Sequence, residues 1–276
     1  MKEIVFLNGN FCGAAKACIP AEDPGLLQGI GLFETMRSRN RKIVYFDEHL
    51  TRIKNSCKLI DLKFPYSVSR LKNIIKKMVE INAVRDARVR LTLWGSKSGT
   101  SILVTAKKYN PFSLGKYKTG FTAEVAAFKQ NEDSWLSQIK TTNRLYYELC
   151  LREAETLGFD EALIVNNSGY IAEATRSNIF LAKNNEIFTP YLKCGCLDGI
   201  TRKAIFDLAK KYKIKAHEEN FTLQDLYYAD EAFLTNSLMG VMPLVSVEKN
   251  KIANGKRGKL TKVFINKYNL LFKNGI

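Results

Sequence analysis

Alternating apolar and polar residues predict several strands in the first third of the chain. Ala87–Trp94 places Val89, Leu91 and Leu93 between polar residues, which is typical of a strand buried on one face. Ile102–Thr105 is expected to pair beside it across a glycine-rich turn, and Phe33–Arg37 is expected to pair with Ile43–Phe46. Ile4–Leu7 is a further short strand, ended by the turn-forming pair Asn8-Gly9.

Apolar residues spaced three and four apart predict amphipathic helices in the same region. Asp47 is placed to cap a helix over Glu48–Leu59, and Ser67 to cap a second helix that begins at Val68. The same spacing recurs later in three segments, the first of which ends before Gly158: Leu145–Leu157, Thr201–Tyr212 and Leu260–Leu271.

Residues 111–120 are rich in Pro, Gly, Lys and Ser and are therefore expected to be a domain linker. It separates a small first domain, residues 1–110, from a larger second domain, residues 121–276. The second domain should contain a strand over Phe121–Ala127 and a run of strands from Glu161 to Thr189. Because strands and helices are mixed without strict alternation, the expected fold class is α/β or α+β.

The composition limits the classes of function. The net charge of +16 is spread along the 276 residues without a nucleic-acid-binding motif, so a nucleic acid is not the expected partner. An anionic substrate and cofactor would suit this charge, although a general bias toward Lys, Asn and Ile accounts for most of it without any function. The sequence contains no run of 18 apolar residues, so no membrane span is predicted. The six scattered cysteines favour a reduced, cytoplasmic protein.

A series of short motifs carries more information than the composition. Lys140-Thr-Thr-Asn-Arg144 is followed by Glu161-Ala-Leu-Ile164, then by Glu173-Ala-Thr-Arg-Ser-Asn-Ile-Phe180, Gly199-Ile-Thr-Arg202 and Leu234-Thr-Asn-Ser237. In this order the segments resemble the class IV (fold type IV) pyridoxal-phosphate enzymes, over nearly the whole chain. This family includes branched-chain and D-amino-acid aminotransferases and aminodeoxychorismate lyases.

The resemblance implies two domains, with pyridoxal 5'-phosphate bound at the domain interface, and a homodimer. It implies that Lys140 forms the Schiff base with the cofactor and then acts as the base, which requires an amine that is neutral part of the time. Glu173 matches the carboxylate that keeps the ring nitrogen protonated, so that the ring can accept electrons. Judged alone, either residue could be an ordinary surface or strand-end charge.

The resemblance also divides phosphate binding among three segments. Ile200 and Thr201 open a helix, whose first N–H groups suit an anion. Asn236 and Ser237 match a second phosphate loop, and Arg52 matches an arginine that can make bidentate contacts. Leu197 matches the residue that packs on the cofactor ring. A solvated arginine and a core leucine are the plain alternatives for Arg52 and Leu197.

The motifs also bear on the reaction. Thr35 occupies the position at which aminodeoxychorismate lyases carry a threonine that assists proton transfer, and the segment from Lys140 to Arg144 resembles their version. A lyase acting on 4-amino-4-deoxychorismate is therefore favoured over an aminotransferase for D- or branched-chain amino acids. Thr35 could also be a simple strand former.

The substrate carboxylate site is less clear, because relatives often carry an arginine in the loop after Ala87–Trp94. Here that loop offers only Lys97, and Arg88 or Arg90 on the strand itself is the alternative. No metal site is expected, since two histidines and the pair Cys194 and Cys196 do not form a ligand set. Glycines 29 and 31 lack the rest of a dinucleotide-binding motif.

Overall fold

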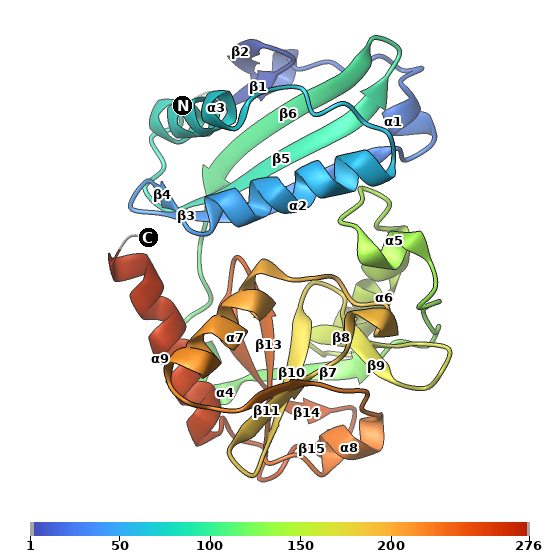
Figure 1. The fold of residues 1–276 in the computed structure, drawn as a ribbon, viewed down its shortest axis with the longest axis vertical. Helices are drawn as coiled ribbons and strands as arrows, with labels where there is room; N and C mark the ends of the chain where they lie inside the picture. The colour runs from blue at the N-terminus through green and yellow to red at the C-terminus, as the bar shows by residue number, and fades with distance from the viewer. Residues whose placement is uncertain (1–2, 275–276) are drawn as a thin grey trace. The chain divides into compact units, whose positions relative to one another are not determined.

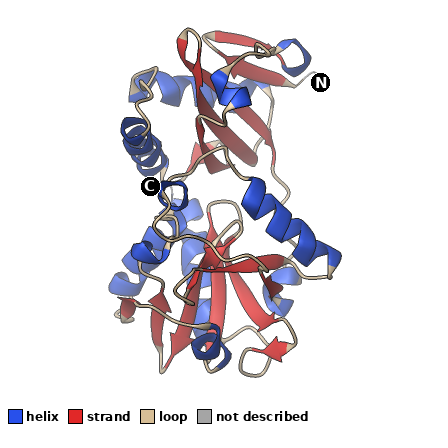
Figure 2. Ribbon diagram, turned by 90° about the vertical axis from the view of Figure 1, so that its right-hand side faces the viewer, coloured by secondary structure: helices blue, strands red, loops and turns tan. Residues whose placement is uncertain are grey.

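A computed structural model describes residues 3–274 of the chain, with side chains up to residue 272. It contains two compact units that mix helices and strands (Figure 2), which confirms the expected α/β class. The described part of the first unit comprises residues 3–110 and Ile139–Asn143, and the second comprises Pro111–Gln138 and Arg144–Asn274. No helix within residues 3–274 is long and apolar enough to cross a membrane.

The first unit is built on a six-stranded antiparallel sheet with the strand order β2-β1-β6-β5-β3-β4. Its strands are β1 (Ile4–Leu7), β2 (Asn10–Gly13), β3 (Gly31–Arg39), β4 (Lys42–Ile43), β5 (Ala87–Ser96) and β6 (Gly99–Lys108). Two short helical turns, η1 (Ala14–Lys16) and α1 (Pro24–Leu27), lie between β2 and β3.

One face of this sheet is covered by α2 (Phe46–Leu59) and α3 (Val68–Ile81), as Figure 1 shows. Met36, Val89 and Val104 point into that core from neighbouring strands, where they meet Ile53 and Met78 of the helices. The other face carries the alternate residues of each strand, because side chains alternate along a strand. The sequence pattern of Ala87–Trp94 is thus confirmed as a half-buried strand.

Two expectations in this unit are wrong in detail. The second strand of the hairpin ends at Ile43 instead of Phe46, and α2 begins at Phe46 after Tyr45, whose φ is 55°. Asp47 therefore lies in the first turn of α2, where its carboxylate pairs with Lys72 at 2.8 Å, and does not cap the helix. Ser67 does cap α3, since its hydroxyl accepts a hydrogen bond from the Arg70 N–H at 3.3 Å.

The second unit is built on a nine-stranded sheet with the order β12-β11-β10-β13-β14-β7-β8-β9, in which β15 pairs with β14. The β14–β7, β7–β8 and β11–β12 pairs are parallel and the others are antiparallel. The strands are β7 (Phe121–Val125), β8 (Glu161–Val165), β9 (Ile171–Ala174), β10 (Asn178–Lys183), β11 (Glu186–Thr189), β12 (Ala216–Glu218), β13 (Glu231–Asn236), β14 (Gly240–Val247) and β15 (Asn250–Lys251).

The helices of the second unit are α4 (Lys116–Thr119), α5 (Trp135–Gln138), α6 (Leu145–Thr156), η2 (Leu192–Cys194), α7 (Ile200–Lys211), α8 (Leu223–Tyr227) and α9 (Lys259–Asn274). The three long helices, α6, α7 and α9, match the predicted segments to within a few residues at each end, whereas the shorter helices were not predicted. Gly158, with φ of 87°, ends the turn after α6 as expected, because a positive φ favours glycine. Residues 111–120, expected to be a linker, carry α4 and belong to this unit.

Candidate active site

Lys140 is held by the first unit, although it lies far along the chain from the other strands there. The Phe33 N–H donates to the Lys140 carbonyl at 2.9 Å, and the Thr142 N–H donates to the Gly31 carbonyl at 2.8 Å. The neighbouring Ile139 is buried in the core of the unit, with 8% of its surface exposed. The backbone on both sides of Lys140 is therefore fixed against β3, while its side chain is half-buried.

The side chain of Lys140 lies beside the ring of Phe33. Its Nζ is 4.8 Å from the ring centroid, and the guanidinium carbon of Arg90 is 3.8 Å from the same centroid. Thr35 is the direct cross-strand partner of Arg90, and Phe33 and Thr35 point to the same face of β3. Two cations thus lie beside a single aromatic ring within the first unit, and Thr35 is on the same face of the sheet.

The predicted substrate residues Arg90 and Lys97 have different surroundings. Arg90 is half-buried on the open sheet face, where its Nε donates to the Thr92 hydroxyl at 3.3 Å. Lys97 lies at the β5–β6 turn, with 68% of its side chain exposed, and forms an ion pair with Glu22. Arg90 is the better placed of the two to bind an anion beside Lys140.

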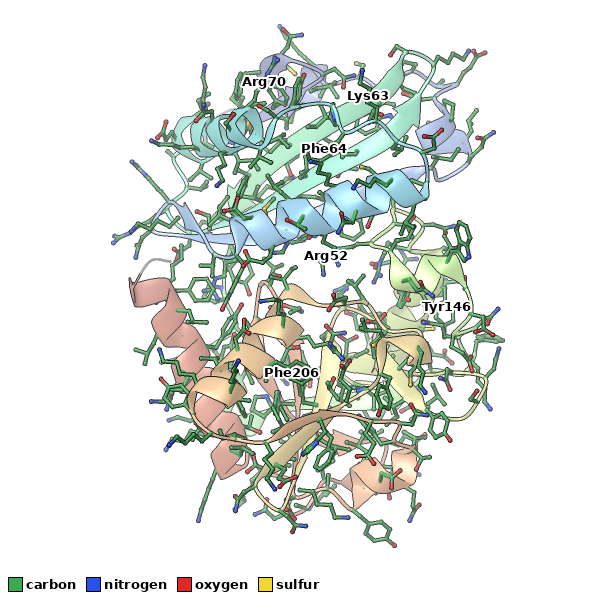
Figure 3. The ribbon with its side chains drawn as sticks, in the orientation of Figure 1. Arg52, Lys63, Phe64, Arg70, Tyr146 and Phe206 are labelled. Carbon is green, nitrogen blue, oxygen red and sulfur yellow. The ribbon has the colours of Figure 1, made fainter. Side chains whose placement is uncertain are left out.

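Arg52 lies on α2 (Figure 3), which covers the face of β3 opposite to the one that carries Phe33 and Thr35. Its Nε and one terminal nitrogen donate to the two carboxylate oxygens of Glu34, each at 2.7 Å. His49 Nδ1 lies 2.6 Å from the same carboxylate. Burial raises the pKa of Glu34, but the charges and hydrogen bonds of Arg52 and His49 outweigh it and hold this pKa at about 2.

In the second unit, Glu173 lies on β9 with only 7% of its surface exposed. Its Oε2 accepts a hydrogen bond from the Leu197 N–H at 3.1 Å, and its Oε1 lies 3.3 Å from the Tyr147 hydroxyl. The direction of both carboxylate oxygens is therefore set by donors from two other segments. A fixed, buried carboxylate is suited to holding a cationic ring nitrogen.

The loop that carries Leu197 is anchored by amide side chains. Asn178 Nδ2 donates to the Leu197 carbonyl at 2.7 Å, Asn166 Nδ2 donates to the Cys194 carbonyl at 3.2 Å, and Gln130 donates to the Gly195 carbonyl. Gly195 has a φ of 88°, which a residue with a side chain rarely adopts. These contacts place the half-buried Leu197 side chain at a defined point next to Glu173.

Helix α7 begins directly after this loop, and its N-cap is Gly199, which has no side chain to cap it. A Cβ at Gly199 would lie 1.9 Å from Asn178 Oδ1, so only glycine fits there. Ile200 and Thr201 form the first turn, and the Thr201 hydroxyl lies 3.3 Å from the Tyr268 hydroxyl of α9. The first N–H groups of such a helix form a site for an anion.

Asn236 and Ser237 lie at the turn between β13 and β14. The Asn236 side chain holds this turn together, since its Oδ1 accepts from the N–H groups of Leu238 and Met239 at 3.0 and 2.9 Å. Its Nδ2 donates to the Arg176 carbonyl at 3.1 Å. Asn236 therefore shapes the loop that carries Ser237.

Each unit, taken by itself, carries groups that suit a part of pyridoxal phosphate. The second unit offers a buried carboxylate for a ring nitrogen, a leucine beside it, and a glycine-capped helix N-terminus for a phosphate. The first unit offers the half-buried Lys140 beside an aromatic ring, and Arg52, whose guanidinium is oriented by two hydrogen bonds to one carboxylate. Within residues 3–274, no three His, Cys, Asp or Glu side chains are grouped so that they could hold a metal ion.

A model of the family described as "Amino-transferase class IV" matches residues 31–247. The chain belongs to the class IV aminotransferase family. The expected resemblance is thereby confirmed, and so is the cofactor, because class IV aminotransferases use pyridoxal phosphate.

Relatives within the class IV family have different activities. A putative branched-chain-amino-acid aminotransferase of Methanocaldococcus jannaschii is 30% identical, and the match covers 96% of this chain and 94% of the relative. An aminodeoxychorismate lyase of Bacillus subtilis is 28% identical, with coverage of 89% and 87%. The solved branched-chain aminotransferase of Thermoproteus uzoniensis has the same fold, with a TM-score of 0.92, 24% identity, and coverage of 100% of this chain and 96% of that one.

Several contacts of this site were not predicted from the sequence. Tyr147, Gln130 and Glu34 each hold a predicted site residue or its loop, yet none belongs to the motifs that carry the resemblance. Glu34 offers one usable signal. It alternates with Phe33 and Thr35 and lies between Leu32 and Met36 on the covered face of β3, where a buried charge requires a charged partner.

Proposed function

We propose that this class IV enzyme is a lyase that converts 4-amino-4-deoxychorismate to 4-aminobenzoate and pyruvate, a step in folate synthesis. The observation that carries the proposal is the position of Thr35. Its side chain shares a sheet face with Phe33, whose ring lies beside the Lys140 amine, and it pairs across the strands with Arg90. These residues bring a hydroxyl that can relay a proton, an amine that can act as a base and a guanidinium that can bind a carboxylate.

In this proposal, Lys140 carries the covalent attachment of the cofactor. When bound, pyridoxal phosphate supplies an electron-withdrawing ring that stabilises the electron pair left by loss of a proton beside the nitrogen. Glu173 keeps a positive charge on the ring nitrogen, and the N–H of Leu197 fixes the direction of its carboxylate. The Leu197 side chain packs against the ring.

The same proposal assigns the phosphate group to donors from three segments. The N–H groups of Ile200 and Thr201 open α7, and the α-helix dipole favours an anion there. Asn236 holds the β13–β14 turn in shape, and Ser237 supplies its hydroxyl. Arg52 contributes its guanidinium, which Glu34 keeps in one orientation.

The elimination needs two proton movements that balance. The freed Lys140 amine removes the proton from the ring carbon that bears the amino nitrogen, and the bond between the ring and the ether oxygen breaks as the ring becomes aromatic. The departing enolpyruvate must gain one proton to become pyruvate, and Thr35 relays that proton. Arg90 binds a substrate carboxylate next to these groups.

An aminotransferase acting on D- or branched-chain amino acids is the second candidate, and the pattern of relatives favours it. Most of the similar proteins are branched-chain or D-alanine aminotransferases. The same Lys140 and Glu173 serve both reactions, because only the fate of the substrate's electron pair differs. The family resemblance further supports a homodimer, for which size-exclusion chromatography with light scattering is the test, and the scattered cysteines support a cytoplasmic location.

The deciding experiment supplies enzymatically generated 4-amino-4-deoxychorismate to the protein with pyridoxal phosphate present. The lyase proposal expects fluorescent 4-aminobenzoate and an equal amount of pyruvate. The aminotransferase would be established instead by two results together. The protein would be yellow, with a cofactor that borohydride fixes covalently, and would form no 4-aminobenzoate but transfer an amino group from D-alanine or leucine to 2-oxoglutarate.

A further inference from the structure

The carboxylate of Glu173 is served by two different donors, one of which has a choice of acceptor. The Leu197 N–H, which donates to Oε2, belongs to the backbone and cannot turn away. The Tyr147 hydroxyl lies 3.3 Å from Oε1 of Glu173 and 3.0 Å from Oε1 of Gln130. The inference drawn from this contact rests on the proposed function, since it concerns the ring nitrogen that Glu173 is proposed to hold.

A phenol has one proton, so Tyr147 donates to Glu173 or to Gln130 but not to both. Gln130 cannot offer a donor to Tyr147 by flipping its amide, because its Nε2 donates to the Gly195 carbonyl. Its Oε1 is therefore an acceptor only. Tyr147 faces two acceptors, of which one is neutral and the other carries a charge that depends on its proton.

Tyr147 stays in its protonated form. Burial raises the pKa of its hydroxyl, and the negative charge of Glu173 raises it further, whereas Arg144 acts in the opposite direction. The Arg144 guanidinium carbon lies 4.0 Å from the centroid of the Tyr147 ring and holds the ring in place. The phenol is therefore a permanent donor at a fixed position.

The charge of Glu173 decides which acceptor the phenol uses, because a hydrogen bond to a carboxylate is stronger than one to a neutral amide. We propose that Tyr147 is a positioning residue that donates to Glu173 when the carboxylate is ionised and turns to Gln130 when it is not, so that it favours a protonated ring nitrogen over a protonated Glu173. The proton that Glu173 shares with the ring nitrogen is thus biased toward the nitrogen.

The size of the bias follows from the difference between the two hydrogen bonds. When Glu173 is protonated, the hydroxyl still makes a neutral hydrogen bond to Gln130. The bias therefore equals the difference in free energy between the charged and the neutral hydrogen bond, not the full free energy of the charged one. The surplus of a charged over a neutral hydrogen bond corresponds to roughly a fivefold to tenfold change in the proton equilibrium. Removing the hydroxyl should move the proton toward Glu173 by this factor.

The test uses the full-length protein loaded with pyridoxal phosphate labelled with ¹⁵N in the ring, and measures the ¹⁵N resonance by NMR. In Tyr147→Phe, which keeps the ring and its contact with Arg144, we expect the resonance to move toward that of an unprotonated pyridine. We also expect kcat to fall by no more than roughly fivefold to tenfold with little change in cofactor affinity, since the electron-withdrawing power of the ring depends on that proton.

Tyr146→Phe is the matched control. Tyr146 is the neighbouring residue on α6 (Figure 3), its ring packs edge-on against Tyr147 at 5.3 Å, and its hydroxyl donates to the Phe128 carbonyl at 2.6 Å. We expect the ¹⁵N resonance of the cofactor in Tyr146→Phe to equal that in the wild type. In a Glu173→Gln background, in which no proton can be shared, adding Tyr147→Phe should leave the resonance where Glu173→Gln puts it.

An unchanged resonance in cofactor-loaded Tyr147→Phe would overturn the inference and leave the proposed function intact. An equal movement in Tyr146→Phe, or a further movement in the double variant, would overturn it as well, because the effect would then not pass through Glu173. A wild-type protein that binds no pyridoxal phosphate, judged by the absence of a cofactor absorbance band, would overturn both the inference and the proposed function.

Discussion

Both carboxylate oxygens of Glu34 accept hydrogen bonds from Arg52, each at 2.7 Å from a different nitrogen of the guanidinium. A bidentate pair of this kind fixes the plane of the guanidinium as well as its position. Glu34 is fully buried, and His49 approaches the same carboxylate at 2.6 Å. The orientation of Arg52, the proposed ligand of the cofactor phosphate, is therefore set by Glu34 on the covered face of the sheet.

Glu34→Gln should reduce the stability of the protein in a pH-dependent way. The pKa of Glu34 is lowered from 4.5 to about 2, so its stabilising effect is fully present above pH 4.5 and is lost as the pH falls toward 2. This shift corresponds to about 3 kcal/mol. Urea unfolding should show a deficit of about that size at pH 7, which becomes smaller between pH 4.5 and pH 3.

Glu22→Gln is the control for this prediction, because Glu22 also pairs with a cation but has 77% of its side chain exposed. We expect it to change stability by less than about 0.5 kcal/mol at any pH. A Glu34→Gln deficit that stays constant down to about pH 3 would show that packing, and not the carboxylate charge, accounts for the loss.

Lys140→Ala should abolish the covalent attachment of the cofactor. Borohydride treatment followed by mass spectrometry should fix pyridoxal phosphate to the wild type at Lys140, and to no residue of the variant. The rate should fall by at least roughly 10²- to 10⁴-fold, the typical contribution of a positioned base. Lys129→Ala, which changes an exposed lysine, should behave as the wild type in both measurements.

The elements of the first unit were predictable where one face of a strand or helix is buried. The alternation in Ala87–Trp94 and the Ser67 cap depend on neighbouring residues only, and both are confirmed. Asp47 has the right residue type for a cap, but Tyr45 with its positive φ starts the helix earlier. A residue type that suits a cap does not fix the backbone angle at which the chain enters the helix.

The site was predictable only through family resemblance. Leu197 donates to Glu173 across 24 residues, and Tyr147 reaches it across 26, so no local pattern links them. The return of residues 139–143 to the edge of β3 is equally non-local, because it depends on backbone hydrogen bonds that leave no mark on residue type. The motifs supplied the candidate residues, whereas the contacts that orient them required the structure.

Thr35→Val should separate the lyase reaction from cofactor binding. Valine keeps the shape and the strand preference of threonine but lacks the hydroxyl, so the cofactor spectrum should be unchanged while 4-aminobenzoate formation slows roughly 10- to 100-fold. Thr35→Ser, which restores a hydroxyl, should recover most of the rate. A Thr35→Val enzyme with the wild-type rate would reduce Thr35 to a strand former.

Arg90 and Lys97 give the last prediction, because both are candidate ligands for the substrate carboxylate and their surroundings differ. Arg90 lies over the ring of Phe33, whose other neighbour is the Lys140 amine, whereas Lys97 is paired with Glu22 at an exposed turn. Arg90→Gln should therefore raise KM for the anionic substrate roughly 10- to 100-fold, the value of a charge-assisted hydrogen bond.

Lys97→Gln should leave KM within about twofold of the wild type, since an exposed ion pair contributes little. Arg90→Lys should recover only part of the affinity, because an ammonium cannot form the two parallel hydrogen bonds of a guanidinium. Steady-state kinetics of the wild type and these three variants decide the matter. If Lys97→Gln raised KM and Arg90→Gln did not, the substrate carboxylate would bind at the β5–β6 turn, and the face shared by Thr35 and Phe33 would lose its assigned role.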